Sequence, residues 1–321
     1  MNFTSFLPEI SLLMCLTLIS FNNFFINESK LKFRVLNFIS LFGIIVIFLL
    51  LLQQFYYTSD FFFSGTAVFD SYGGLLKILA LLSFVFVKFF IGDAYLVENE
   101  KEVLISFVCL FGVFIAVSSN NLLLTFTGFE LLNLVYFGYL KKYCSNEPQK
   151  TAAFFYRSWL ISSSLMFFGI SIFYGLCGTL NYDLISSFIS SNPVNKLTFT
   201  IAILLVFSGF AFKLFIFPLQ SLMLNFYEKL KIDKATIILV TSIIAASGAL
   251  TRFVYSAFYE RNAFALNGST HSLTPIFNWE LFFLIIFCLT ALSSALVLYL
   301  QQDFIKILIY IIFVNSPLVL L

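Results

Sequence analysis

Ionisable side chains lie inside apolar stretches of this sequence, where a charge is costly unless it pairs or moves protons. Glu9, Lys77, Glu130, Arg157 and Lys213 are all flanked by hydrophobic runs. A charged group at the centre of a bilayer costs about 2.5–3.5 kcal/mol or more, and it usually faces a protein interior or water and pairs with another such group. We therefore treat these residues as candidates for proton transfer.

Glu130 and Lys213 are the strongest of these candidates. Glu130 lies about ten residues into an apolar stretch, with Thr127 and Asn133 one turn away and Gly128 leaving room for a neighbouring helix. Pro218 follows Lys213 by five residues, so a helix there should be kinked or unwound around 214–220. Broken helices at membrane depth line cavities or water.

The chemistry expected of this pair is reversible proton binding. Burial disfavours the charged form of a lysine and a nearby carboxylate favours it. The two effects together allow a lysine such as Lys213 to take up and release protons near neutral pH. The alternatives are that Glu130 is a structural carboxylate held by a hydrogen bond, and that Lys213 extends to the membrane interface.

The other ionisable residues have weaker signals. Arg157 lies about two turns into an apolar stretch and is either an auxiliary proton-transfer group or interfacial. Lys77 lies on the second turn of its stretch and could equally extend to the interface. Glu9 follows Pro8 and could lie at the level of the lipid headgroups.

The elements that position these residues are predicted to be membrane helices. Of 321 residues 60% are hydrophobic and 11% charged, with a mean hydropathy of +0.99, whereas soluble domains carry about 25% charged residues. The apolar runs are continuous and long enough to span a bilayer as helices, and their lack of alternation excludes a barrel. The sequence predicts about ten helices, near 3–22, 34–54, 71–91, 103–119, 121–140, 152–175, 197–224, 235–257, 277–299 and 303–321.

The basic residues predict how these helices are oriented, because cytoplasmic or matrix loops are enriched in Lys and Arg. One side holds Lys30, Lys32, Arg34, Lys88, Lys101, Lys141, Lys142, Lys150, Lys229, Lys231, Lys234 and Lys306. The opposite side holds Lys196, Arg252 and Arg261. This asymmetry places the N-terminus on the outer side, and a miscounted helix would have scrambled it.

Composition also bounds the function. A net charge of +2 gives no case for nucleic-acid binding. The five cysteines are scattered singly, and the one histidine, His271, lies in a polar loop over 258–275. Neither a metal site, a haem nor an iron–sulfur cluster is expected from this chain alone. The first apolar run lacks a basic start and a small-residue cleavage site, so we expect a membrane helix there.

Six short motifs in register resemble one family, subunit 2 of NADH dehydrogenase, known in bacteria as subunit N. The motifs are Leu7-Pro8-Glu9-Ile10, Asp70, Ser119-Asn120-Asn121-Leu122-Leu123 with Gly128-Phe129-Glu130-Leu131, Tyr174-Gly175 with Gly178-Thr179-Leu180-Asn181, Phe212-Lys213-Leu214 with Pro218 and Tyr227-Glu228, and Lys306-Ile307-Leu308. Their order and spacing agree with the family from residue 5 to the end of the sequence.

The resemblance implies an all-α, antiporter-like fold made of two inverted five-helix units, each with a broken helix and a central lysine. It implies an N-terminal three-helix segment over 1–100, a first unit over 101–257 and the start of a second, incomplete unit over 258–321. In this family a glutamate modulates the lysine of the broken helix, and these roles would fall to Glu130 and Lys213. The family has no active site for NADH or quinone in this subunit.

The sequence departs from the family at several positions. A further family lysine aligns near Ile243, so that relay position is missing. Another aligns near Phe154, with Arg157 one turn further as a stand-in. Two family histidines align with Gln220 and about Ser316. Lys306 and Gln220 are therefore auxiliary candidates, together with Arg157 and Lys77. The family usually continues for about four more helices.

The resemblance implies a proton-translocating subunit of the membrane arm of complex I, with flavin, iron–sulfur clusters and quinone held by other subunits. The expected partners are other membrane-arm subunits, lipids and a separate chain that supplies the missing helices. The phenylalanine-rich composition suggests an AT-rich organelle genome and hence the mitochondrial inner membrane, rather than a bacterial plasma membrane. The alternatives are a structural subunit without net pumping and a cation/proton antiporter.

Overall fold

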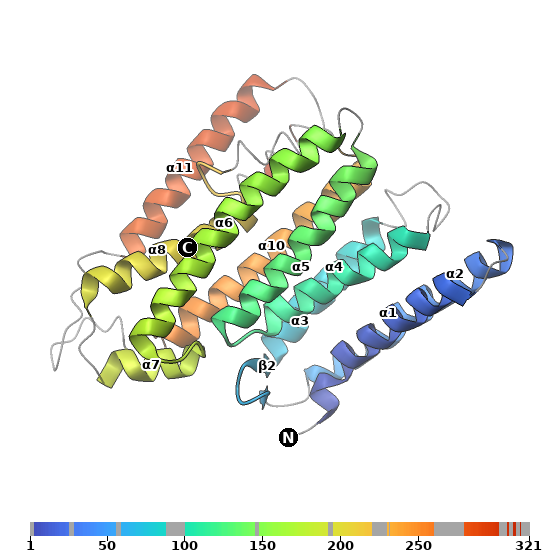
Figure 1. Cartoon of the computed structure of the whole chain (residues 1–321), viewed down its shortest axis with the longest axis horizontal. Helices are drawn as coiled ribbons and strands as arrows, with labels where there is room; N and C mark the ends of the chain where they lie inside the picture. The colour runs from blue at the N-terminus through green and yellow to red at the C-terminus, as the bar shows by residue number, and fades with distance from the viewer. Residues whose placement is uncertain are drawn as a thin grey trace. The chain divides into compact units, whose positions relative to one another are not determined.

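The computed structural model describes residues 3–25, 29–55, 59–87, 100–144, 148–191, 195–219, 230, 232–259 and 279–301, with single residues 307, 311, 312 and 315. These residues are mainly helical (Figure 1). The helices are η1 (Phe3–Phe6), α1 (Leu7–Phe25), α2 (Ser29–Gln54), α3 (Ser71–Phe86), α4 (Glu100–Ser118), α5 (Leu122–Tyr143), α6 (Pro148–Cys177), α7 (Tyr182–Ser191), α8 (Lys196–Lys213), α10 (Ile232–Val254), the π-helix η3 (Tyr255–Tyr259) and α11 (Trp279–Leu300).

Helices occur in every predicted range up to 277–299. Among the described residues, 6 helices are long and apolar enough to cross a membrane, and 71–86, 102–118 and 197–213 form shorter apolar helices. The helix predicted over 197–224 ends earlier, at Lys213. The range 303–321 with Lys306, the loop 258–275 with His271, and Gln220 lie wholly or mainly outside the described residues.

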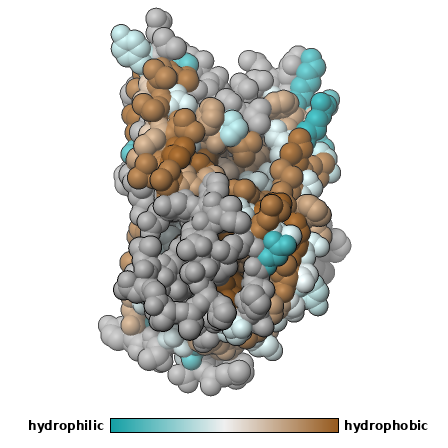
Figure 2. Space-filling view, turned by 90° about the vertical axis from the view of Figure 1, so that its left-hand side faces the viewer, coloured by the Kyte–Doolittle hydropathy of each residue, from teal (hydrophilic) through white to brown (hydrophobic). Residues whose placement is uncertain are grey.

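The described surface is largely apolar. Leu, Ile, Phe and Tyr side chains are exposed along α1, α2, α3, α6 and α11, and brown, hydrophobic side chains predominate over teal ones where Figure 2 is coloured. Water would penalise so much apolar surface, whereas lipid accepts it. This surface is what a polytopic membrane protein requires.

The chain divides into two compact units. The first comprises Met1–Ser119, Thr127–Tyr139 and Ile232–Gly248, and the second comprises Asn120–Phe126, Leu140–Lys231 and Ala249–Leu321. In the first, α1 packs against α2 and α4, and α3 packs against the same two helices. In the second, α6 packs against α8, while α7 contacts α6 and η3. The segments predicted over 1–100, 101–257 and 258–321 stay a prediction.

Sequence patterns missed a β-hairpin between α2 and α3. Strand β1 (Asp60–Phe62) pairs antiparallel with β2 (Ala67–Phe69), and the turn uses positive φ at Phe63, Ser64 and Gly65. The hairpin leads directly to Asp70, whose side chain accepts a 2.8 Å hydrogen bond from the Gly73 amide. The aspartate of the family motif is thus the N-cap of α3.

The short helix α7 was also not predicted. It follows α6 after a turn in which Gly178 has a φ of 69°, a conformation that glycine adopts at little cost. Tyr182 begins α7 and is fully buried. Its ring packs against Phe253, which also contacts Phe173 and Phe210. These aromatic contacts join α6, α7, α8 and the end of α10 into the core of the second unit.

Candidate functional site

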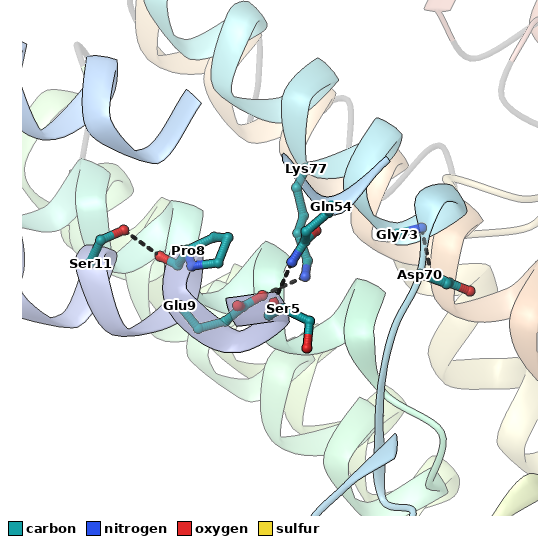
Figure 3. Close-up of polar contacts among 8 residues, drawn as sticks. All are labelled: Ser5, Pro8, Glu9, Ser11, Gln54, Asp70, Gly73 and Lys77. Carbon is teal, nitrogen blue, oxygen red and sulfur yellow. Dashed lines mark hydrogen bonds and ion pairs between the residues drawn. The ribbon is translucent and has the colours of Figure 1, made fainter. Parts of the chain in front are cut away.

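Lys77 and Glu9 form a buried ion pair in the first unit (Figure 3). Lys77 extends from α3 and Glu9 from the first turn of α1, and they are 1% and 5% exposed. The charged amine also lies 4.8 Å from the centre of the Phe69 ring and 5.6 Å from that of Phe114, where cation–π attraction adds to the ion pair. Lys77 therefore does not extend to an exposed surface, which was one of the two alternatives left open for it, whereas the depth of Glu9 relative to the headgroups stays a prediction.

The pair is buried because Phe69 of β2 and Phe114 of α4 lie beside the Lys77 amine, and because the end of α2 contacts the segment that leads into α1. Gln54, from the end of α2, donates a 2.6 Å hydrogen bond to the Ser5 carbonyl beside Glu9. In Figure 3 the side chains of Gln54 and Lys77 point from neighbouring helices toward the start of α1. Opposite charges compensate for lost hydration only when they meet at close range. Burial here depends on contacts between segments far apart in the sequence.

Glu130 lies within α5, partly buried, and Asn133 one turn later donates a 3.4 Å hydrogen bond to its carboxylate. The prediction that Gly128 allows close helix approach is confirmed. A Cβ at Gly128 would lie 2.8 Å from the backbone nitrogen of Ala116 on α4. One turn further, Leu132 packs against Gly112 of α4 in the same way. Two glycines thus hold α4 against the stretch of α5 that carries Glu130.

Lys213 is the last residue of α8 and is 2% exposed. The Leu214 amide still donates a 2.8 Å hydrogen bond to the Phe210 carbonyl, but Phe215 has a φ of 57° and the helix does not continue. Pro218 disfavours a helical conformation of Phe217, the residue directly before it. The interruption predicted around 214–220 therefore begins after Lys213, while the last part of the helix predicted over 197–224 falls in 220–224, outside the described residues.

Close packing of α8 against α6 fixes where Lys213 lies within the second unit. A Cβ at Gly169 on α6 would approach the Val206 nitrogen to 2.7 Å. Met166, one turn earlier on α6, fills the space over Gly209 of α8. The hydroxyl of Ser162 donates a 3.2 Å hydrogen bond to the Ser208 carbonyl. Contacts over several turns thus position the end of α8.

Lys234 forms a second ion pair that sequence patterns missed. The lysine was expected in a loop, but it lies in the first turn of α10, 4% exposed, and pairs with Glu102 near the start of α4. Its amine also lies 2.8 Å from the Asp233 carboxylate. We refer to Glu102 and Lys234 as the inner ion pair. Its only sequence signal was an acid and a base at the ends of two predicted helices on the same side of the membrane.

Buried hydroxyl groups lie along the same helices. The Ser106 hydroxyl on α4 lies 2.9 Å from that of Tyr139 on α5. The Tyr136 hydroxyl lies 3.1 Å from that of Thr241 on α10, and Cys109 donates to Thr241 at 3.5 Å. All of these side chains are buried. Hydroxyl groups both donate and accept hydrogen bonds, so such pairs can pass a proton.

The remaining candidates are less central. Arg157 is exposed on α6, and whether it is an auxiliary proton-transfer group or an interfacial residue stays a prediction. Glu130 and Lys213 belong to different units, and their pairing stays a prediction. Within the described residues the structure therefore brings together Lys77 with Glu9 and Glu102 with Lys234, besides Glu130 with Asn133.

Two of the family motifs, the one that contains Asn121 and the one that contains Asn181, contact each other in the second unit. The Asn121 side chain caps α5 by accepting from the Leu123 amide at 2.8 Å and donates to the Asn181 side chain at 2.6 Å. Asn120 donates to Asp183 at 2.8 Å. Their role is to fasten the start of α7 to the start of α5, a structural rather than a chemical function.

Comparisons with known proteins agree with this arrangement. A family model described as "NADH:quinone oxidoreductase/Mrp antiporter, TM" matches residues 119–311. NADH-quinone oxidoreductase subunit N 2 of Chloroherpeton thalassium is 28% identical over 260 residues, covering 78% of this chain and 50% of that protein. Subunit N of Alkalilimnicola ehrlichii is 27% identical over 233 residues, covering 71% and 47%. The chain spans about half the length of the curated relatives it matches.

Solved structures with the same fold include membrane complexes of three kinds. A chain of respiratory complex I from Thermus thermophilus with bound aureothin gives a TM-score of 0.74 at 16% identity, covering 97% of this chain and 62% of that one. The archaeal membrane-bound sulfane sulfur reductase gives 0.74 at 16% identity, covering 98% and 63%. The Mrp complex of a Dietzia species gives 0.71 at 16% identity, covering 100% and 58%.

Proposed function

Because the chain belongs to the NADH:quinone oxidoreductase/Mrp antiporter family, we propose that it is a proton-translocating subunit in the membrane arm of respiratory NADH:quinone oxidoreductase, complex I. The observation that carries the proposal is Lys213, a lysine 2% exposed at the end of a helix that stops inside an apolar span. The curated relatives named as subunit N of that complex support the same assignment.

In the proposed mechanism Lys213 takes up and releases a proton while Glu130 changes its affinity for that proton. Opposite charges favour each other's charged form and desolvation opposes it, so a small change nearby moves the proton. Helix α8 is proposed to be the first half of a broken helix, which exposes backbone groups to a hydrated route. About ten membrane helices are proposed for the chain.

Redox chemistry is proposed to take place elsewhere in the complex. We assign no cofactor to this chain and place flavin, iron–sulfur clusters and quinone in other subunits. The chain then contributes to an oxidoreductase without an active site of its own. Other membrane-arm subunits are the proposed partners. That a separate chain supplies helices matching the rest of the relatives' length stays a prediction.

The family and the apolar helices make this a membrane protein. The curated relatives named above are bacterial, which favours a plasma membrane over the mitochondrial inner membrane that the phenylalanine-rich composition suggested. In either membrane the distribution of basic residues places the N-terminus on the outer side.

Replacing Lys213 tests the proposal in the assembled complex. Lys213→Met replaces the proton-binding amine with a side chain that does not titrate. The number of protons translocated per NADH oxidised in sealed vesicles should therefore fall, while the complex still assembles. Lys213→Arg, which keeps a charge that does not titrate, should fail in the same way. Lys150→Met, at an exposed position on α6, is the matched control and should leave translocation unchanged.

A structural subunit without net pumping is the second candidate. It is favoured by α10, where Lys234 and Arg252 near its two ends are the only basic residues and Ile243 stands at the family's lysine position. Unchanged translocation in Lys213→Met would establish this alternative over the first. A stand-alone antiporter, as in the Mrp-like fold, would instead be indicated if the chain purified without flavin and iron–sulfur subunits that oxidise NADH.

A further inference from the structure

Polar side chains recur every third residue along the middle of α5. Glu130, Asn133, Tyr136 and Tyr139 form this series, which we call the α5 polar strip. Each step advances about 4.5 Å along the helix and turns about one-sixth of the way around it. The three steps from Tyr139 to Glu130 add up to about half a turn, so Tyr139 lies on the side of α5 that faces α4 and Glu130 lies on the opposite side. Neighbouring members of the strip stay within about 5–6 Å at their Cβ atoms.

Two members of the strip are joined to hydroxyls on neighbouring helices. Ser106 donates to the Glu102 carbonyl at 2.7 Å, so Tyr139 is the donor in its 2.9 Å contact with Ser106. Thr241 donates to the Ile237 carbonyl at 2.6 Å, so Tyr136 donates to Thr241. At rest both tyrosines thus point their protons toward α4 or α10.

The two ends of the strip meet groups of opposite kinds. Tyr139 lies near the end of α5 that adjoins the inner ion pair, because Ser106 is one turn from Glu102 on α4. At the other end Asn133 contacts Glu130. Asn133 is 3% exposed, and its side-chain carbonyl oxygen has no hydrogen-bond donor among the described residues. Buried amide oxygens normally have a partner, often water.

We propose that the α5 polar strip, with Ser106 and Thr241, conducts protons between the inner ion pair and Glu130. The proposal rests on the proposed function and on the orientation predicted from basic residues, which puts the inner ion pair at the cytoplasmic or matrix end of the helices. It supplies a hydroxyl route on α5 and α10, where α10 lacks the family's lysine.

Each step of this route keeps atoms and charge balanced. A hydroxyl accepts a proton on its oxygen from the group behind it and releases its own proton to the group ahead, so no bond other than O–H changes. A water bound to the Asn133 carbonyl oxygen joins Tyr136 to the Glu130 carboxylate, which receives the proton. Each transfer leaves the hydroxyl proton pointing toward the group behind, as at rest for Ser106 and Tyr139, so the hydroxyls rotate to point ahead before the next transfer.

The test removes single hydroxyls in the assembled complex and keeps the rings. Tyr136→Phe and Tyr139→Phe should each slow proton translocation about tenfold, a loss within the range for a positioned proton-transfer group. The solvent isotope effect in D₂O should change in the same variants, which a purely structural hydroxyl would not cause. Tyr174→Phe, at an exposed position on α6, is the matched control and should behave as wild type.

The outcomes separate this inference from the proposed function. If Lys213→Met abolishes translocation while both tyrosine variants keep the wild-type rate and isotope effect, the strip does not conduct and only this inference fails. If Lys213→Met is itself without effect, the proposed function fails first. A tyrosine variant that assembles poorly is replaced by Thr241→Val, which removes the facing hydroxyl with a side chain of the same shape and should slow translocation likewise.

Discussion

Charged residues inside an apolar protein are held by partners that lie far away in the sequence. Lys77 meets a carboxylate 68 residues earlier, and Lys234 meets Glu102 across two helices. Removing either member of the Lys77–Glu9 pair leaves one charge buried without compensation, a loss of about 3–5 kcal/mol. Which carboxylate belongs to which lysine depends on helix packing, so the sequence indicated the charges and not their pairing.

Lys77→Met should therefore lower the free energy of unfolding by about 3 kcal/mol because it leaves Glu9 charged and buried. The double variant Lys77→Met with Glu9→Gln should lose less than the sum of the two single losses, because the double variant leaves no isolated buried charge. Thermal unfolding of the purified protein in detergent measures both. Strictly additive losses, or a loss as large in Lys150→Met, would contradict the ion pair.

Residue-level predictions succeeded where a single side chain carried the signal. Gly128, read as a site of close helix approach, does allow α4 to approach, and Pro218 does follow the end of a helix at Lys213. The buried positions of Lys77 and Lys234 could not be predicted, because a lysine near the end of an apolar run reaches the interface unless a neighbouring segment covers it. That cover comes from the hairpin and from α4.

At the scale of elements, the start of α5 is fastened by side chains rather than by helix propensity. Asn121→Ala removes both the acceptor for the Leu123 amide and the donor to Asn181. We expect a loss of about 2 kcal/mol, since a cap and a second polar partner are lost together. Asn195→Ala at α8 removes only an exposed 3.2 Å cap and should cost about 1 kcal/mol. Equal losses in thermal unfolding would argue against the second contact.

The contact between α6 and α8 makes a sharper prediction at glycine positions. Gly169→Ala would place a Cβ 2.7 Å from the Val206 nitrogen, so the helices must separate at a cost of about 1–3 kcal/mol. Gly175→Ala on the same helix meets nothing within 4 Å and should be neutral or stabilising by up to about 1 kcal/mol. Gly169→Ala should lower the thermal unfolding temperature, whereas Gly175→Ala should leave it unchanged or raise it. A shared direction would show that α6 does not pack as described.

The sequence predicted the long helices but not the short elements between them. Continuous apolar runs predicted the long helices because hydrophobic length alone indicates a span. They missed α7, a 10-residue helix whose position depends on contacts from Asn120 and Asn121, the two residues that precede α5. They also missed the hairpin, whose strands have only three residues each. Short elements fixed by distant contacts leave little local signal.

For the molecule as a whole, the charge asymmetry predicts which ends of the helices face the inside. Lys150→Cys, exposed near the start of α6, should react with a membrane-impermeant thiol reagent only from the inner side, and Ser191→Cys, exposed at the end of α7, only from the outer side. The measurement is done in a Cys288→Ala background, since Cys288 is exposed while the other cysteines are buried. Labelling of both positions from one side would overturn the orientation.

The glycine contacts between α4 and α5 have a mechanical consequence. Gly128 brings the two backbones into direct contact, and Leu132 wedges over Gly112 one turn away. Direct backbone contact at Gly128 leaves little room for adjustment, so the two helices should resist sliding and move together over this stretch. A displacement of α4 in the turn that carries Glu102 should therefore also displace the stretch of α5 that carries Glu130.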